Sequence, residues 1–423
     1  MKKAQSIEDI YSVFAHEKFL KFEDEEFYVD LYGKETKLFV AELKLNQIPS
    51  KSFFIAGQSG NGKSTLLNLL TTNYPDVNSK YEFHYIAGRS IFLYEDIDII
   101  DVLLMIGNKL TEGSETLKLR YFEKLQKLKD VKTGVYEEST LSSDKSDETL
   151  SASAKISVGA KFFSLFNAST DFEASYKINE EIRKDARKFF KIQRKELIDL
   201  TNDIILEYRK EKSNGKDLII VIDDLEKKEN IDELFLKDMP LLNELNIVKI
   251  IAMPIHLKRN YTFPNSNVRE FGLKLKKFDG TDSSNDLQLL KEVIQKRLGN
   301  NSLITNDAIN LAIMYSGANL RQLIKIIHFA ALEALTFEAE TITVQEVNNS
   351  IERLQRDYSS QVMGMKKFLN EIKINKLYLE DSEENLKKIA KATKMELVFA
   401  YFNGTVWYDI NPVIQKALDQ YSQ

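Results

Sequence analysis

Short apolar runs alternate with amphipathic stretches over the first two thirds of the chain. Each run is short and is bounded by polar or turn residues, which is typical of buried strands in a parallel sheet. Between the runs we expect helices, at Lys63–Leu70 and at about Ile97–Leu110. Alternating strands and helices predict an α/β fold, a parallel sheet flanked by helices. The expected strands are Ser52–Ala56, Tyr81–Tyr94, Leu218–Ile222 and Ile247–Ala252.

The pattern changes between about residues 111 and 179, where we expect an insertion. A charged helix leads into Glu137–Asp147, a polar run without periodicity that predicts a mobile loop. Ala154–Tyr176 alternates small, polar and aromatic residues, which predicts a β-hairpin. Apolar positions spaced by three or four then predict one long amphipathic helix over Asn179–Glu211.

The last third of the chain is expected to be mostly helical. Helical patterns continue from about Phe271 to Tyr358, and two strand-like runs, Leu397–Phe402 and Thr405–Ile410, follow. Asn403-Gly404 between them is a strong hairpin signal, so the tail is similar to a winged helix. The predicted organisation is an N-terminal segment (1–50), a core (51–265) with the insertion, a helical lid (266–360) and a winged-helix-like domain (361–423).

Composition sets broad limits on function. The chain has 423 residues, enough for two to four domains at roughly 100–200 residues each. It contains no cysteine, which excludes disulfides and thiolate chemistry, and only four histidines. The net charge of −5 argues against a surface that binds nucleic acid throughout. Met1–Ile10 lacks the apolar core of a signal peptide, and no run has the ~18–20 apolar residues of a transmembrane segment. We therefore expect a cytoplasmic protein.

A glycine-rich stretch between the first expected strand and the following helix is the strongest motif. Its sequence fits G-x-x-x-x-G-K-[ST], the pattern of a phosphate-binding loop. Glycines let backbone N–H groups curl around a phosphate, and the helix directs its N-terminal dipole at the anion. Lys63 is expected to reach the β- and γ-phosphates, and the Ser64 hydroxyl to ligate Mg²⁺. The expected nucleotide-binding residues are Gly57, Gln58, Ser59, Gly60, Asn61, Gly62, Lys63, Ser64 and Thr65.

A second acidic motif follows the apolar strand Leu218–Ile222. Enzymes with a phosphate loop need a carboxylate at the end of a neighbouring strand to hold magnesium. Asp223 is our candidate for the metal, Asp224 for polarising the attacking water, and Glu226 is the reserve. No N-K-x-D motif for guanine and no L-S-G-G-Q transporter signature occur, so ATP is the expected nucleotide.

With these motifs in this order, the chain resembles AAA+ and STAND-type ATPases, which include origin-recognition initiators and bacterial defence ATPases. The resemblance also rests on Ser316-Gly317-Ala318-Asn319-Leu320-Arg321 in the lid and on the candidate winged helix. It implies that Arg321 folds over the γ-phosphate and reports its presence. A planar, permanently charged guanidinium suits that task, whereas the alternative is a surface arginine on a lid helix.

Some positions depart from that family pattern. The strand after the acidic one ends in Met253-Pro254, where the family has a polar residue, and His256 is the nearest substitute. Arg259 and Arg269 are weak candidates for the arginine finger that a neighbouring subunit receives. The hydrolytic acid is Asp224, where most AAA+ enzymes carry glutamate. We infer slow turnover, with ATP acting more as a switch ligand than as fuel.

Two further features raise the question of partners. The aromatic run Lys161–Phe166 is either an exposed tip that grips a partner or a segment that packs on its own domain. The helix after it is rich in basic residues, which either contact DNA phosphates or form a solvated face. These basic residues are Arg183, Lys184, Arg187, Lys188, Lys191, Arg194 and Lys195.

These observations leave three classes of function open. The first is a homo-oligomeric ATP-dependent switch that regulates a protein effector, with bacterial antiphage defence as the setting that the resemblance suggests. The second is an initiator or loader that binds DNA. The third is a scaffold that holds nucleotide without hydrolysing it.

Overall fold

The computed structural model describes the backbone over most of the chain, and every structural statement below refers to these residues. The described ranges are 1–15, 20, 22–70, 72–88, 96–140, 161–164, 176, 179–225, 231–260, 266–271, 284–376, 382–402 and 406–420.

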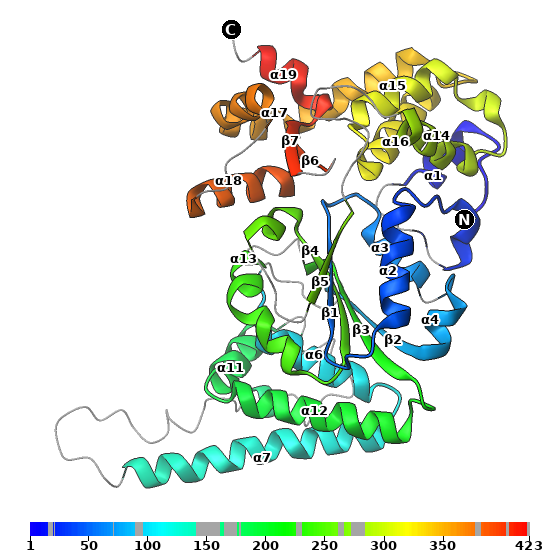
Figure 1. Ribbon diagram of the computed structural model, residues 1–423. Helices are drawn as coiled ribbons and strands as arrows, with labels where there is room; N and C mark the ends of the chain where they lie inside the picture. Colours follow the sequence, from blue (N-terminus) through cyan, green and yellow to red (C-terminus); the bar gives the residue numbers. More distant parts are fainter. Residues whose placement is uncertain are drawn as a thin grey trace.

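Five parallel strands form a central sheet in the order β2-β3-β4-β1-β5 (Figure 1), which confirms the predicted α/β class. Two details differ from expectation. β4 lies between β1 and β3, so the acidic strand is one strand further from the phosphate loop than expected. β5 falls in the range assigned to the lid but is the edge strand beside β1. The strands are β1 (Ser52–Ala56), β2 (Tyr81–Ala87), β3 (Asp217–Asp223), β4 (Val248–Met253) and β5 (Ser266–Glu270).

Helices cover both faces of this sheet because each buried strand presents apolar residues alternately to the two sides. Phe53 and Ile55 of β1 pack on one face with α2, α3 and α4. Phe54 and Ala56 pack on the other face with α6 and α12. The bounds of these helices are α2 (Lys34–Leu45), α3 (Lys63–Leu70), α4 (Pro75–Lys80), α6 (Ile99–Thr111) and α12 (Arg194–Glu211).

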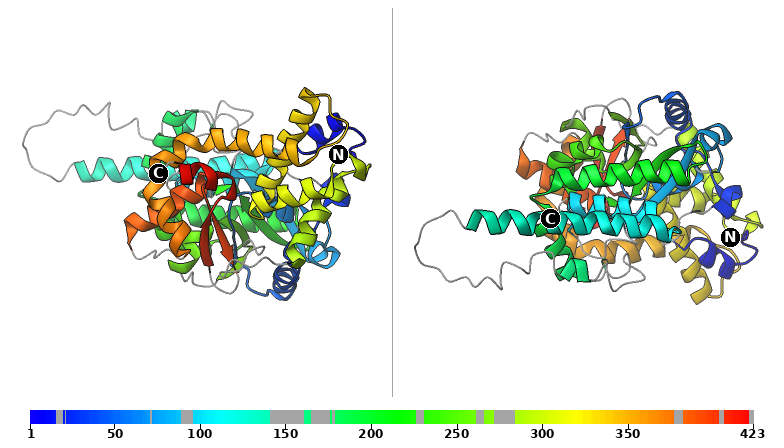
Figure 2. Two further views of the ribbon diagram at one scale, coloured as in Figure 1. Left: turned by 90° about the horizontal axis from the view of Figure 1, so that it is seen from above. Right: turned by 90° about the horizontal axis from the view of Figure 1, so that it is seen from below.

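The insertion starts with α7 (Glu115–Thr140), whose distal end projects away from the body (Figures 1 and 2). Its near part is bound to α12, where Lys124 pairs with Asp203 at 2.7 Å. The predicted mobile loop begins too early, because residues 137–140 are still helical; its remainder, 141–147, lies outside the described residues.

The predicted hairpin over 154–176 is wrong at the positions that the structure describes. Residues 161–164 form a helical turn, and Tyr176 is also helical. Phe162 and Phe163 are buried within the domain. The Phe162 ring lies 5.6 Å from that of Phe190, and the Phe163 ring lies 5.3 Å from that of Phe189. These two aromatic residues therefore pack on their own domain; Phe166 lies outside the described residues.

The expected long helix is divided in two. α11 (Glu180–Phe190) ends shortly before α12 begins, and Ile192 between them is 69% exposed. The apolar spacing continues in phase across this break, which is why periodicity alone predicted one helix.

The two arginines of α11 are committed to internal pairs, whereas its lysines, Lys184 and Lys188, are exposed. Arg183 is only 1% exposed and donates to the Asp96 carbonyl at 2.9 Å. Arg187 pairs with Asp96 and donates through Nε to the buried Asp101 at 3.0 Å. Tyr176 also donates to Asp101, at 2.7 Å. We call these five residues the insertion cluster. Arg194 further along pairs with Asp238 at 2.9 Å, so the predicted solvated or DNA-binding face is wrong for these three arginines.

The lid is a helical layer above the carboxyl ends of the strands (Figure 1). The first helix of the chain packs into the lid core through Ile7, Ile10 and Phe14. His328 Nδ1 donates a hydrogen bond to the Tyr11 carbonyl, 2.8 Å away, and the His328 and Tyr11 rings stack. The lid helices are α1 (Ile7–Val13), α14 (Ser284–Arg297), α15 (Asn306–Ser316) and α16 (Leu320–Thr336).

The C-terminal region is joined to the lid by one continuous helix, α17 (Val344–Asn375), which crosses the predicted boundary at residues 360–361. The predicted hairpin is confirmed: β6 (Val398–Phe402) pairs antiparallel with β7 (Val406–Ile410). Tyr401 and Trp407 stack across the pair with ring centroids 4.5 Å apart. Asn403-Gly404 lies outside the described residues. A winged-helix role for this region stays a prediction.

The remaining described elements are short, apart from one helix beside the hairpin. Among the described helices, none has both the length and the apolar content that crossing a membrane requires. The elements are η1 (Phe22–Phe27), α13 (Ile231–Glu233), η3 (Leu234–Asp238), η4 (Met239–Glu244), η5 (Ile255–Asn260), η6 (Asn301–Leu303), α18 (Glu383–Lys394), η7 (Pro412–Ile414) and α19 (Gln415–Gln420).

Candidate functional site

The phosphate loop joins β1 to α3, as the sequence predicts. Gly60 and Gly62 have φ of +86° and +79°, which residues with a side chain rarely adopt. Such turns direct N–H groups at a bound anion, and the first turn of α3 adds N–H groups that have no acceptor within the helix. Ser64 and Thr65 lie in that first turn. The loop therefore has the backbone form of an anion site.

Lys63 folds back over this loop. Its side chain is almost fully buried, and Nζ donates to the carbonyls of Gly57 at 2.9 Å and Gln58 at 3.0 Å. A buried ammonium group held by loop carbonyls supplies a positive charge at the point where an anionic ligand would add its own oxygens.

The N-terminus of α16 lies directly against the loop. Asn319 caps the helix by accepting from the Gln322 N–H, and its Nδ2 donates to the Ser59 carbonyl at 2.9 Å. The Arg321 N–H donates to the Gly60 carbonyl at 3.2 Å. A Cβ at Gly60 would lie only 2.4 Å from Asn319 Oδ1, so this close approach also requires glycine.

The side chain of Arg321 connects the loop to a charged cluster in the lid. Its Nη1 donates to Ser59 Oγ at 2.6 Å and to Glu396 at 3.2 Å. Glu396 also pairs with Lys325 at 2.9 Å and accepts from the Tyr358 hydroxyl at 3.2 Å. We call Arg321, Lys325, Tyr358 and Glu396 the lid cluster. The arginine suggested by the sequence thus lies at the phosphate loop, where its side chain contacts a hydroxyl and a carboxylate.

The C-terminal hairpin contacts the loop as well. Gln58 Nε2 donates to the Val398 carbonyl at 2.8 Å, and its Oε1 accepts from the Ala400 N–H at 2.7 Å. The amide therefore pairs with the edge of β6 much as another strand would. One loop residue joins parts of the chain about 340 positions apart.

The opposite side of the loop is supported by the N-terminal segment and by the end of β5. The Tyr32 hydroxyl donates to the Asn61 carbonyl at 2.6 Å, and Asn61 Nδ2 donates to the Phe271 carbonyl at 3.0 Å. The Tyr32 and Phe271 rings pack edge to face. Contacts from α16, from the C-terminal hairpin, from the N-terminal segment and from the end of β5 therefore hold the loop in place.

The acidic pair lies at the end of β3. Asp223 is nearly fully buried, accepts from the Tyr85 hydroxyl at 2.5 Å and accepts from the Asp224 N–H at 2.8 Å. Asp224 has φ of +60°, a left-handed conformation that costs a non-glycine residue about 1–2 kcal/mol. Backbone strain of this kind concentrates at functional sites, which fits a role for Asp224. Glu226, the reserve candidate, lies outside the described residues.

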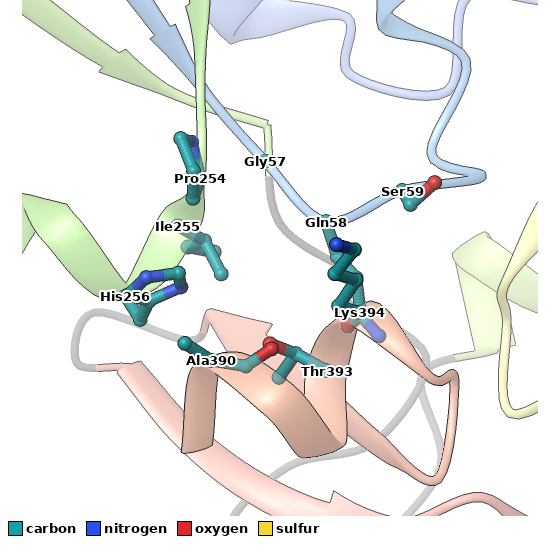
Figure 3. Close-up of a pocket in the computed structure, with 9 residues that line it drawn as sticks. All are labelled: Gly57, Gln58, Ser59, Pro254, Ile255, His256, Ala390, Thr393 and Lys394. Atoms are coloured by element: carbon teal, nitrogen blue, oxygen red, sulfur yellow. The ribbon is translucent and has the colours of Figure 1, made fainter. Parts of the chain in front are cut away.

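A small cleft lies between the loop and α18 (Figure 3). It is lined by Gly57–Ser59, His256 and Lys394 among others, and its volume is about 50 Å³. This holds about three or four water molecules and not a nucleoside triphosphate. His256 lies 2.9 Å from Asp232, which orients its ring beside the loop. A nucleotide that enters from this side must therefore displace α18, which lines the cleft opposite the loop.

Of the two finger candidates, the structure describes the side chain of Arg269. Arg269 pairs with Glu42 through two nitrogens and approaches Glu35, so it ties β5 to α2. The side chain of Arg259 lies outside the described residues. The role of both residues between subunits stays a prediction.

The donor set fits magnesium. In the described residues, no three His, Cys, Asp or Glu side chains gather to hold a metal by themselves. Magnesium is usually bound through one or two carboxylates together with substrate phosphates and water, not by a closed protein cage. The Ser64 hydroxyl and the Asp223 carboxylate, at the carboxyl ends of β1 and β3, are oxygen ligands of the required kind.

Sequence reasoning missed the parts that hold the loop in place. Glu396, Tyr32 and Tyr85 carry no motif, and their partners lie far away in sequence. Gln58 was predicted only as a variable loop position that contacts nucleotide. No pattern within one segment reveals such contacts, because the fold alone brings the residues together.

Together, the sheet order, the glycine loop at the end of β1 and the acids at the end of β3 form the P-loop nucleoside triphosphatase fold, a parallel sheet flanked by helices with a helical lid. No family model matches the sequence, and no curated protein matches it.

Solved structures with a similar arrangement share little sequence with the chain. The ORC1 protein of Aeropyrum pernix in complex with DNA is 11% identical, with 97% of this chain and 96% of that chain covered and a TM-score of 0.43. Drosophila ORC bound to DNA is 10% identical, with 97% and 91% covered and a TM-score of 0.42. The Thermotoga maritima RuvB branch migration motor is 9% identical, with 95% and 97% covered and a TM-score of 0.39. Likenesses at this level transfer no ligand, activity or partner.

Proposed function

We propose that the chain binds ATP with Mg²⁺ at the phosphate loop and hydrolyses it slowly, as a switch. The observation that carries this proposal is that one loop forms two sets of contacts. Its backbone and Lys63 have the form of an anion site, while Gln58, Ser59 and Gly60 bind the hairpin and the lid. A ligand that binds one arrangement of these contacts better than the other shifts the equilibrium between them.

The roles within the site follow from charge and position. Lys63 neutralises charge on the β- and γ-phosphates, and the loop N–H groups hold the β-phosphate. Ser64 and Asp223 hold the magnesium ion, which when bound offsets the negative charge of the phosphate oxygens. Asp224 orients the attacking water, with Glu226 as the reserve, and Arg321 contacts the terminal phosphate.

Slow turnover is supported by the surroundings of the loop. β4 ends at Met253 and is followed by Pro254, and neither residue has a side-chain group to orient a water molecule. His256 and Asp232 are the nearest polar pair on that side, and they are bonded to each other. Aspartate at position 224 is one methylene shorter than glutamate, so it reaches less far into the site.

We extend the proposal to assembly and partners. The resemblance to AAA+ and STAND-type ATPases favours a homo-oligomer that regulates a protein effector, and the setting in antiphage defence rests on that resemblance alone. Arg183, Arg187 and Arg194 pair within the chain, so the DNA-binding alternative depends on the exposed lysines of this region, Lys184, Lys188, Lys191 and Lys195.

The test is to measure phosphate release and oligomeric state together, for the wild type, Lys63→Ala and Asp224→Asn. We expect slow release that both substitutions abolish, and retention of ATP and of a larger assembly only by Asp224→Asn. The same assay with DNA, at low and at higher salt, examines the alternative. Stimulation by DNA that fades with salt favours an initiator, since phosphate contacts are salt-dependent. Absence of ATP binding by the wild type contradicts the proposal altogether.

A further inference from the structure

Glu396 occupies a fixed position between α18 and β6. Its backbone has φ of +58°, its N–H donates to the Thr393 carbonyl, and its carbonyl accepts from Asn411 Nδ2 at 2.9 Å. Its side chain is 12% exposed. The backbone at residue 396 is therefore held from both sides, and the carboxylate lies in the lid cluster within reach of Arg321 and Lys325.

This carboxylate is held as an anion. Burial raises the pKa of Glu396, but the ion pairs with Lys325 and Arg321 outweigh burial and lower the pKa from its ordinary value. Three groups contact it, Lys325, Arg321 and the Tyr358 hydroxyl, and each of them donates. Charge-assisted hydrogen bonds of this kind are about twice as strong as neutral ones.

The position of the anion is the unusual feature. A single nitrogen, Arg321 Nη1, contacts both Ser59 Oγ of the phosphate loop and Glu396. A fixed negative charge therefore lies one guanidinium away from a loop built for phosphate. Like charges in a partly buried site repel, and a further negative charge on the ligand increases the repulsion.

We propose that Glu396 sets the discrimination between nucleoside triphosphate and diphosphate, by competing with the terminal phosphate for Arg321. This inference rests on the proposed function of the phosphate loop. With a diphosphate in the loop, Arg321 keeps its pair with Glu396 and the lid cluster is intact. A triphosphate brings an anion to the same guanidinium, and binding then includes the cost of separating Arg321 from Glu396. Glu396 is thus a positioning residue that acts through Arg321.

The competition also links the nucleotide to the hairpin. Residue 396 immediately precedes β6, whose edge is bonded to Gln58. When Arg321 turns to a terminal phosphate, the hairpin loses one of its attachments to the lid. A partner that binds the hairpin only when it has separated from the loop therefore binds more tightly in the presence of triphosphate. By thermodynamic linkage, that partner raises the affinity for triphosphate by the same factor.

The experiment is to measure the dissociation constants of Mg·ATPγS and Mg·ADP by isothermal titration calorimetry. The variants are the wild type, Glu396→Gln, Arg321→Ala and the double variant. Gln is close in shape to Glu but uncharged. The quantity compared is the ratio of the ADP dissociation constant to the ATPγS dissociation constant. We expect this ratio to be at least about fivefold higher in Glu396→Gln than in the wild type, which is within the usual range of coupling between sites. In the Arg321→Ala background the same substitution should leave the ratio unchanged.

Lys325→Met is the matched control, because it removes an ion pair with the same carboxylate but leaves Arg321 bound to it. A merely structural role for Glu396 predicts that both variants alter the two affinities alike, whereas the proposal predicts that only Glu396→Gln raises the ratio. Glu396→Asp, which keeps the charge but shortens its reach, serves if the Gln variant does not fold, and should raise the ratio less.

The possible results test the nucleotide site and the role of Glu396 separately. If the wild type binds neither nucleotide, the proposed function fails and the inference fails with it. If the wild type binds both and Glu396→Gln leaves the ratio unchanged or lowers it, the role of Glu396 is overturned while the nucleotide site stands.

Discussion

The lid cluster and the insertion cluster are built from the same chemistry but lie in different surroundings. Both join arginine to carboxylate, and in both a tyrosine hydroxyl donates to the carboxylate. The insertion cluster lies beneath α11, and its Asp101 is fully buried. The lid cluster touches Ser59 of the phosphate loop through Arg321. The surroundings of an ion pair therefore decide its role. Where an incoming anion can replace the carboxylate, the arginine can change partners. Where no anion can reach the arginine, the ion pair only stabilises the fold.

The largest expected effect comes from breaking the insertion cluster. Asp101→Ala leaves Arg187 and Tyr176 without their main acceptor, and removing one partner of a buried ion pair costs about 3–5 kcal/mol. Urea unfolding should show a loss of this size, while the ratio of ATP to ADP affinity stays constant. Asp96→Ala is the control: its side chain is 48% exposed, so the loss should be smaller. A change in the nucleotide ratio with Asp101→Ala would remove the distinction between the clusters.

The second effect concerns Arg321. Arg321→Ala should weaken ATP binding about tenfold or more while ADP binding changes little, because a hydrogen bond to a charged group contributes about 1.5–3 kcal/mol. The stability of the protein should fall much less than with Asp101→Ala, since Lys325 still neutralises Glu396. Fluorescence titration and thermal unfolding of one preparation give both numbers. Equal losses for the two nucleotides would place Arg321 away from the terminal phosphate.

A smaller effect is expected at Gln58. Gln58→Leu keeps the volume approximately but leaves the Val398 carbonyl and the Ala400 N–H without their partner, which costs about 1–3 kcal/mol if the groups stay buried. If the hairpin separates from the loop instead, the cost falls and both nucleotides bind faster. Stopped-flow binding rates together with the unfolding free energy distinguish these outcomes. Unchanged rates and unchanged stability would show that this contact holds nothing in place.

The smallest effect is the pH dependence that Glu396 adds to stability. Its folded pKa lies below the ordinary 4.5, so its stabilising contribution is present above that value and is lost as the pH falls through the folded pKa. The stability difference between the wild type and Glu396→Gln should therefore shrink below pH 4.5. A difference that stays constant into that range would mean that the carboxylate gains nothing from Arg321 and Lys325.

Features of the fold and the site that depend on a short stretch of sequence could be predicted, whereas contacts between distant segments could not. The phosphate loop, the buried strands and the C-terminal hairpin follow from short patterns. β1, β3, β4 and the hairpin lie where predicted, whereas β2 ends at Ala87 and β5 was not predicted as a strand. The single helix over 179–211 was wrong because its apolar spacing continues across a break at Lys191–Gln193. The basic face was misread because sequence shows where arginines are but not that Asp96 and Asp101 meet them. For the same reason no pattern could have found Glu396.

The loop that we propose receives the nucleotide also anchors the C-terminal hairpin, through Gln58. Hydrogen exchange at the Ala400 amide tests this directly, because that N–H donates to Gln58 Oε1. We predict that Mg·ATP speeds exchange in the segment Val398–Phe402 of the wild type, that ADP does so less, and that Lys63→Ala shows no change with either. Equal exchange in the wild type with ATP, with ADP and without nucleotide, under conditions where ATP is bound, would contradict the claim.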